Sequence, residues 1–191
     1  MSAMPRPSLV SELDYLRGEE GAKRKHEYRA GRVYAMAGAK TGHDRVAANF
    51  LGIMHRGLRG GPCEAFGSDM KVRIALASGT SFYYPDGMVV CDANDADSAF
   101  QERPAAIAEV LSDSTRRTDE GEKLDAYRQI PTLGVYLLIE PGRPEVTAWR
   151  WGAAGVEPEL HAGSDAVVPL PGVGAELPLV ELYERVVFGT A

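Results

Sequence analysis

Apolar residues recur every three or four positions in four segments of the chain, a spacing that predicts helices with one buried face. The clearest of these segments covers residues 42–58 and is followed by glycines and a proline, which commonly end helices. A shorter segment covers residues 8–17, and Ser8 can cap this helix with its hydroxyl oxygen. The other two expected helices cover residues 118–130 and 179–188.

Shorter apolar or alternating segments predict the β-strands. Residues 82–91 are mostly apolar, and we expect one strand there, with Pro85 near its start or at a bulge. The Ala30-Gly31 pair predicts a tight turn before the next strand. The other expected strands cover residues 33–36, 63–66, 71–76, 105–111, 135–139 and 145–151, with short edge strands after them.

The order of these elements is helix, several strands, helix, strand, which predicts an α/β fold with a mixed central β-sheet flanked by helices. The sequence contains no internal repeat and no linker long enough to divide domains. We therefore expect residues 1–191 to form a single domain. Residues 152–191 are expected to be a C-terminal extension that packs on the core or forms a dimer contact.

The composition indicates a folded protein without a membrane helix. Hydrophobic residues make up 45% of the chain, but no apolar run approaches the roughly 20 residues that a membrane helix needs. The N-terminus lacks the apolar stretch of a signal peptide, so we expect a cytoplasmic location. Cys63 and Cys91 are the only cysteines, and we expect both to be buried and reduced.

The net charge of −6 argues against a protein that passively coats nucleic acid, because such proteins neutralise phosphates with Lys and Arg. The charge does not argue against a metal-dependent enzyme, whose metal offsets the acidic residues around it. Local clusters of basic residues at 23–25 and 116–117 are interpreted as solvated surface.

Two acidic residues stand in apolar segments, where a carboxylate is costly unless a charged group pairs with it. Asp86 follows Pro85 within the segment 82–91, and Glu109 stands between Ala108 and Val110. One bound cation would neutralise both, and carboxylate oxygens are ligands that Mg²⁺ accepts. The alternatives are a turn aspartate bonded to backbone amides and a glutamate at a strand edge.

Lys123 lies on the helix that follows Glu109, and Asp119, Lys123 and Tyr127 share one face of that helix. A helix packed on the sheet would bring the Lys123 ammonium beside the two acids. Taken alone, Lys123 is more simply a surface lysine paired with Asp119, and Tyr127 a core residue. Lys123 and Tyr127 indicate an active site only in combination with the two acids in the apolar segments.

Several linked motifs from about Lys25 to Trp151 resemble the Uma-two family of proposed restriction endonucleases, within the PD-(D/E)xK nuclease superfamily. The motifs are HEYRAGRVYAMAGA, GHDRVAANF, PCEAFGSDMKVRI, YYPDGMVVC, AEVLSDSTRRTDEGEKLDAYRQIP and YLLIE. The resemblance implies a restriction-endonuclease-like fold and metal-dependent cleavage of phosphodiester bonds.

By this resemblance Asp86 occupies the aspartate of the PD motif and Glu109 the acidic position that follows it. The superfamily lysine would stand two residues after the glutamate, where this sequence has Leu111, so its role is assigned to Lys123. The resemblance also implies that Glu27, Asp69 and His43 are accessory residues, although His43 is equally well explained as a residue that packs or caps locally at a helix end.

The sequence therefore predicts a Mg²⁺-dependent or Mn²⁺-dependent DNA endonuclease in which Asp86 and Glu109 bind the metal and Lys123 acts on the attacking water. Asp69 or Glu27 would hold a second metal or position the first. The alternative is an inactive protein on a nuclease scaffold that binds nucleic acid or a partner. A hydrolase acting on another phosphate compound is a third reading. We also expect a homodimer, because duplex cleavage commonly pairs two symmetric sites.

Overall fold

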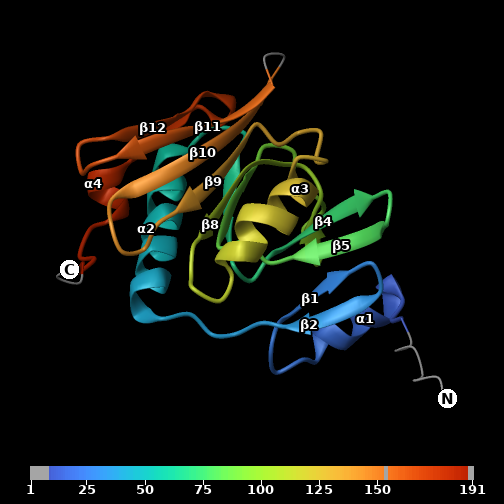
Figure 1. Cartoon of the computed structure of the whole chain (residues 1–191). Coiled ribbons are helices and arrows are strands. Elements are labelled where there is room, and N and C mark those ends of the chain that lie inside the picture. Colours follow the sequence, from blue (N-terminus) through green and yellow to red (C-terminus); the bar gives the residue numbers. More distant parts are fainter. Residues whose placement is uncertain (1–8, 153–154, 189–191) are drawn as a thin grey trace.

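The computed structural model describes residues 9–152 and 155–188, in which two larger β-sheets, a two-stranded sheet and four main helical segments form layers (Figure 1). The five-stranded sheet has the order β2-β1-β5-β4-β7. Its strands are β1 (His26–Arg29), β2 (Arg32–Ala35), β4 (Lys71–Leu76), β5 (Gly79–Tyr83) and β7 (Phe100–Gln101). The predicted turn at Ala30-Gly31 joins β1 to β2, and both of its residues have positive φ.

The six-stranded sheet has the order β11-β10-β9-β8-β6-β3. Its strands are β3 (Glu64–Gly67), β6 (Gly87–Val90), β8 (Pro104–Val110), β9 (Val135–Ile139), β10 (Glu145–Gly152) and β11 (Gly155–Ala162). Strands β8 and β9 are parallel, as are β4 and β7, whereas the other neighbours in the two sheets are antiparallel. The predicted α/β fold with mixed sheets is confirmed, although its strands form two larger sheets rather than one.

The helices cover the faces of these sheets. Helix α1 (Glu12–Glu20) lies against the five-stranded sheet, and α2 (Thr41–Gly57) crosses one face of the six-stranded sheet (Figure 1). A π-helical turn, η1 (Thr118–Lys123), continues directly into α3 (Leu124–Tyr127) on the opposite face of that sheet. After the hairpin of β12 (Val167–Leu170) and β13 (Ala175–Pro178), which encloses the short η2 (Pro171–Val173), the chain reaches α4 (Leu179–Leu182).

The alternation of side chains along β8 explains why the core has two halves. Ala106, Ala108 and Val110 point towards α2 and belong to one hydrophobic cluster. Ile107 points the other way and joins the cluster that contains α3. Because successive residues of a strand face opposite sides, Glu109 is directed to the same side as Ile107, under η1 and α3.

The segment 82–91 is not the single strand that its apolar character predicts. It contributes Phe82 and Tyr83 to β5 in one sheet and residues 87–90 to β6 in the other. The chain crosses between the sheets at Tyr84, Pro85 and Asp86. Gly87 is needed directly after the crossing, because a Cβ there would lie 2.5 Å from two ring carbons of Phe50. The crossing thus places Asp86 where the two sheets meet.

The expected helices at the two ends of the chain differ from those found. Helix α1 begins at Glu12, and the Ser11 hydroxyl accepts a hydrogen bond from the Asp14 amide, so Ser11 is the N-cap. The predicted cap, Ser8, lies outside the described residues. At the C-terminus the expected helix 179–188 has only the four residues of α4, and the chain then turns at Tyr183.

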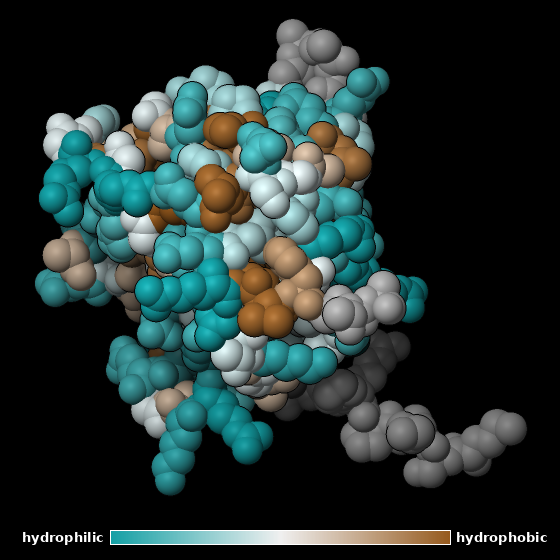
Figure 2. Space-filling model, turned by 90° about the vertical axis from the view of Figure 1, so that its left-hand side faces the viewer, coloured by the Kyte–Doolittle hydropathy of each residue, from teal (hydrophilic) through white to brown (hydrophobic). Residues whose placement is uncertain are grey.

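Several apolar side chains of this C-terminal segment are buried within the protein. Leu177, Leu179 and Leu182 are fully buried in the cluster with α2, whereas Val180 and Val187 remain exposed. Figure 2 shows hydrophobic residues as separate brown groups on a mainly hydrophilic face. Dimerisation through this segment therefore stays a prediction with few apolar side chains left to support it. Within the described ranges, no helix has the length and apolar character needed to cross a bilayer.

The expectation of two reduced cysteines is wrong. Cys63 and Cys91 form a disulfide that links the start of β3 to the residue after β6. The two cysteines flank the Glu64–Val90 pair of the antiparallel ladder, which places them opposite each other. Their separation of 28 residues in the sequence concealed this pairing, because the spacing of two cysteines does not indicate which strands become neighbours.

Candidate active site

Glu109 and Lys123 lie in direct contact inside the protein. The Lys123 ammonium donates a hydrogen bond of 2.9 Å to Glu109 Oε1, and the Tyr127 hydroxyl donates one of 2.8 Å to the same oxygen. All three side chains are almost completely buried. The helical face that carries Asp119, Lys123 and Tyr127 is thus turned towards β8, as its four-residue spacing predicts.

Two more carboxylates approach the same ammonium. Lys123 Nζ lies 3.3 Å from Glu27 Oε1 and 3.1 Å from Asp119 Oδ1. Glu27 comes from β1, and its other oxygen accepts a 2.6 Å hydrogen bond from Arg29. The structure therefore places Glu27 in this cluster and adds Asp119, which the sequence suggested only as a helical neighbour of Lys123.

Asp86 lies at the edge of this cluster, between β5 and β6. Its Oδ2 accepts a 2.8 Å hydrogen bond from the Val110 amide and lies 3.2 Å from His43 Nε2, which comes from the first turn of α2. The ladder between β6 and β8 ends with Gly87 opposite Ala108, so Asp86 and Glu109 occupy adjoining positions just beyond it. The structure thus gathers two acids that are 23 positions apart in the chain.

Asp69 is not part of this cluster. Its side chain is 98% exposed and pairs with the Lys25 ammonium at 3.0 Å. Lys25 also donates a hydrogen bond to the Ser68 carbonyl oxygen, which holds this pair at the turn before β4. The contacts of Asp69 therefore do not support the expectation that it lies near the site. The sequence shows that Asp69 precedes a strand, but it does not show how far that strand start lies from the other strands.

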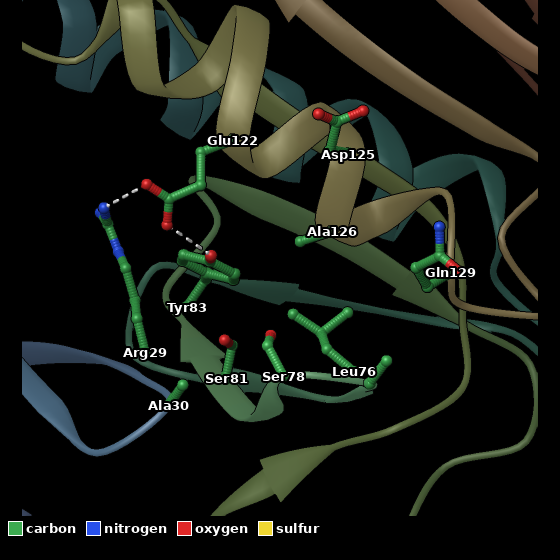
Figure 3. Close-up of a pocket in the computed structure, with 11 residues that line it drawn as sticks. Arg29, Ala30, Leu76, Ser78, Ser81, Tyr83, Glu122, Asp125, Ala126 and Gln129 are labelled. Atoms are coloured by element: carbon green, nitrogen blue, oxygen red, sulfur yellow. Dashed lines mark hydrogen bonds and ion pairs between the residues drawn. The ribbon is translucent and has the colours of Figure 1, made fainter. Parts of the chain in front are cut away.

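An open pocket of about 520 Å³ adjoins the buried cluster. Figure 3 shows Glu122 pointing from the helix towards Arg29 and Tyr83 on the neighbouring strands. Glu122 accepts hydrogen bonds of 2.9 Å from Arg29 and 3.1 Å from the Tyr83 hydroxyl. Since Arg29 also binds Glu27, it connects the pocket wall to the Lys123 cluster. Sequence periodicity did not indicate this role for Arg29 or Glu122.

Burial and neighbouring charges shift the pKa values of the cluster. Burial, reinforced by the negative charges of Asp119 and Asp86, raises the pKa of Glu109 to about 8, although the Lys123 ammonium opposes this shift. Burial alone would lower the pKa of Lys123, but the attraction of the three surrounding carboxylates raises it, so the ammonium stays charged. Burial likewise raises the pKa of Tyr127, which therefore remains a neutral hydrogen-bond donor.

The oxygens that remain free at Asp86 and Glu109 decide whether a metal fits. Both hydrogen bonds to Glu109 go to Oε1, and both contacts of Asp86 go to Oδ2. Each acid therefore keeps a second oxygen for a cation, and Mg²⁺ commonly takes one or two carboxylates together with waters and phosphate oxygens. Over residues 9–152 and 155–188, no group of three or more Asp, Glu, His or Cys side chains is arranged to hold a metal unaided.

His43 provides a test of this arrangement. The hydrogen bond to Asp86 raises the pKa of His43 above its usual value of 6.5, although burial partly opposes the shift. A raised folded-state pKa means that the pair stabilises the fold below about pH 6.5 and loses this contribution as the pH rises through the raised pKa. In an NMR titration of ring protons, Asp86→Asn should lower the His43 pKa, and an unchanged value would show that Asp86 does not pair with His43.

Comparison with known proteins identifies related sequences and a related structure. The Uma2 family model, described as "Putative restriction endonuclease", matches residues 12–179. The Synechocystis uncharacterized protein slr1290 is 31% identical over 185 residues, covering 96% of each chain. The Synechocystis uncharacterized protein sll1609 is 34% identical over 143 residues, covering 73% of this chain and 80% of its own.

A solved structure shares the fold. It is a "putative nuclease belonging to DUF820" from Anabaena variabilis, with a TM-score of 0.69 and 17% sequence identity. The similarity covers 87% of this chain and 93% of that one. The two chains therefore share the same fold over most of their lengths.

Proposed function

The chain belongs to the Uma2 family, and from this premise we propose that it is a divalent-metal-dependent DNA endonuclease with Asp86, Glu109 and Lys123 in its active site. The observation that carries the proposal is the direct contact between the buried Lys123 and Glu109, beside Asp86 at the meeting point of the two sheets. Interacting ionisable groups with shifted pKa values are typical of catalytic sites.

Asp86 and Glu109 would hold Mg²⁺ or Mn²⁺ through their free oxygens. When bound, this metal supplies charge neutralisation at the phosphate and a water of lowered pKa. Lys123 holds a permanent positive charge next to Glu109, where it can orient the attacking water and offset negative charge on the phosphate. Tyr127 fixes Glu109 Oε1 by its hydrogen bond and so leaves the second oxygen available for the metal.

Accessory residues position this machinery. His43 holds Asp86 Oδ2, and the Val110 amide holds the same oxygen from the opposite strand. Glu27 helps to keep Lys123 charged and in place. For cleavage of duplex DNA we also propose a homodimer, since one site cuts one strand and a two-fold pair of sites cuts both.

The experiment that tests this proposal is plasmid cleavage by the purified protein with Mg²⁺, with Mn²⁺ and with EDTA. We expect nicking or linearisation only with a divalent ion, and a loss of at least about 100-fold in Asp86→Ala and in Lys123→Ala, because one loses a metal ligand and the other a charge at the phosphate. Asp165→Asn changes an exposed acid far along the chain and should cleave like the wild type.

Cleavage that persists at the wild-type rate in both Asp86→Ala and Lys123→Ala would refute the proposed site. A wild-type protein that does not cleave any plasmid would favour the second reading, an inactive nuclease scaffold. The observation behind that reading is the absence, among the described residues, of a ready three-ligand metal group. Calorimetry with millimolar Mg²⁺ separates the two, because the inactive scaffold is expected to bind no metal.

A further inference from the structure

The Lys123 ammonium is surrounded by carboxylates from three different elements. Glu109 from β8, Asp119 from η1 and Glu27 from β1 approach it at 2.9, 3.1 and 3.3 Å. The four residues are between 1% and 7% exposed, so bulk water screens these charges little. Three acids from separate elements therefore converge on one cation, the Lys123 ammonium.

Other residues balance only part of the negative charge around this point. Arg29 binds the outer oxygen of Glu27 and so compensates one of the three acids. Glu109 and Asp119 have only Lys123 as a cation within ion-pair distance among the described residues. Asp119 Oδ1 is buried and accepts no hydrogen bond of good geometry, although it faces the ammonium at 3.1 Å. The Lys123 ammonium is thus the cation that faces this buried carboxylate oxygen.

The distances also show why a metal and the lysine exclude each other. The three oxygens stand about 3 Å from the nitrogen, a normal length for N–H···O contacts. Metal–oxygen distances are shorter, about 2.0–2.1 Å for Mg²⁺ and about 2.3–2.6 Å for Ca²⁺. With the ammonium present there is no room for an ion between these oxygens. Without it, the acids need to move inward by about 0.8–1.3 Å to reach Mg²⁺ distances and by up to about 1.0 Å to reach Ca²⁺ distances.

We propose that the Lys123 ammonium is the built-in cation of a site formed by Glu27, Glu109 and Asp119. The lysine takes the place that a second divalent ion would occupy, and removing its side chain creates a divalent-metal site there. The proposal of a first metal ion at Asp86 and Glu109 rests on the proposed function. The metal site expected when the Lys123 side chain is removed does not depend on catalysis. Glu27 and Asp119 are therefore positioning residues for Lys123 rather than ligands of a second metal in the natural protein.

The test counts bound Mn²⁺ ions by isothermal titration calorimetry and by loss of the free-ion EPR signal. Lys123→Ala is expected to bind one ion more than the wild type, whatever number the wild type binds. Lys123→Met keeps a side chain of similar length without its charge, so it should gain no ion. The double variant Lys123→Ala/Asp119→Asn should lose the gain, and Lys23→Ala, an exposed lysine, should match the wild type.

Folding is followed at the same time by circular dichroism. If Lys123→Ala unfolds without metal, Mn²⁺ or Ca²⁺ at millimolar concentration should restore the wild-type spectrum, because an ion that binds only the folded state stabilises it. A variant that stays unfolded with metal, or a folded one with no additional ion, would overturn the inference. A wild type that binds no ion while Lys123→Ala binds one would refute the proposed metal site and support the inference, so the two failures are distinguishable.

Discussion

Lys123→Met is expected to lower the free energy of unfolding by about 3–5 kcal/mol at pH 8, because it leaves a buried group of carboxylates without its cation. The side chain is 5% exposed and lies within 3.3 Å of three acids. Methionine occupies a similar volume, so little of the loss arises from a cavity. Since the lysine also supplies the charge proposed to act at the phosphate, the variant should lose DNA cleavage as well.

The decrease in the free energy of unfolding caused by Lys123→Met should become smaller as the pH falls. Without Lys123, Glu109 loses the positive charge that opposes the effect of burial, so its folded-state pKa rises further above the unfolded value of about 4. A raised carboxyl pKa destabilises the fold above the unfolded pKa, and the cost disappears as the pH falls and the acids take up protons. Between pH 8 and pH 5 the difference between Lys123→Met and the wild type should therefore become smaller.

Urea denaturation at pH 8 and pH 5 measures both effects, with Lys23→Met as the matched control at an exposed lysine. The control should lie within about 0.5 kcal/mol of the wild type, as surface substitutions usually do. A loss below about 1 kcal/mol for Lys123→Met at pH 8, or a loss that grows on acidification, would show that Lys123 does not neutralise these acids in the folded protein.

Reduction of the Cys63–Cys91 disulfide is expected to lower the free energy of unfolding by about 3–4 kcal/mol. The bond closes a loop of 28 residues, and a loop of this length restricts the unfolded chain by roughly that amount. In the folded state it joins β3 to β6, the strand that follows Asp86, so the outer edge of the six-stranded sheet loses its covalent link.

Urea denaturation with and without a phosphine reductant measures this effect, after thiol titration has confirmed that the oxidised protein has no free cysteine. The double variant Cys63→Ala/Cys91→Ala is the control, because the reductant should not change its stability. If reduction alters the wild type by less than about 1 kcal/mol, the bond does not restrict the unfolded chain as its loop length predicts.

Local patterns in the sequence were sufficient for several parts of the site. Glu109 stands out because apolar residues surround it, and the structure shows it 3% exposed. The four-residue spacing of Asp119, Lys123 and Tyr127 predicted one helical face, and all three side chains lie on the Glu109 side of that helix. Linked motifs also predicted the family, since they extend over most of the chain.

Contacts between distant segments could not be predicted in this way. Residues 82–91 carry the apolar signal of one strand, but the chain changes sheets at residues 84–86. The close packing of Phe50 against Gly87 directly after this crossing depends on the tertiary structure. The pairing of Cys63 with Cys91 depends on which strands become neighbours. Asp69 precedes a strand as expected, but it turns to Lys25 rather than to the site.

By itself, the sequence determined most of the local elements, the α/β class, the family and the two acids that burial makes costly, because these follow from periodicity and from the chemistry of neighbouring residues. Only the tertiary structure decided that Glu27, Glu109 and Asp119 share the charge of Lys123 and that Asp86 lies beside them. The reason is physical: such contacts join segments up to about a hundred residues apart, and their distances depend on how strands pair and helices pack rather than on any local pattern.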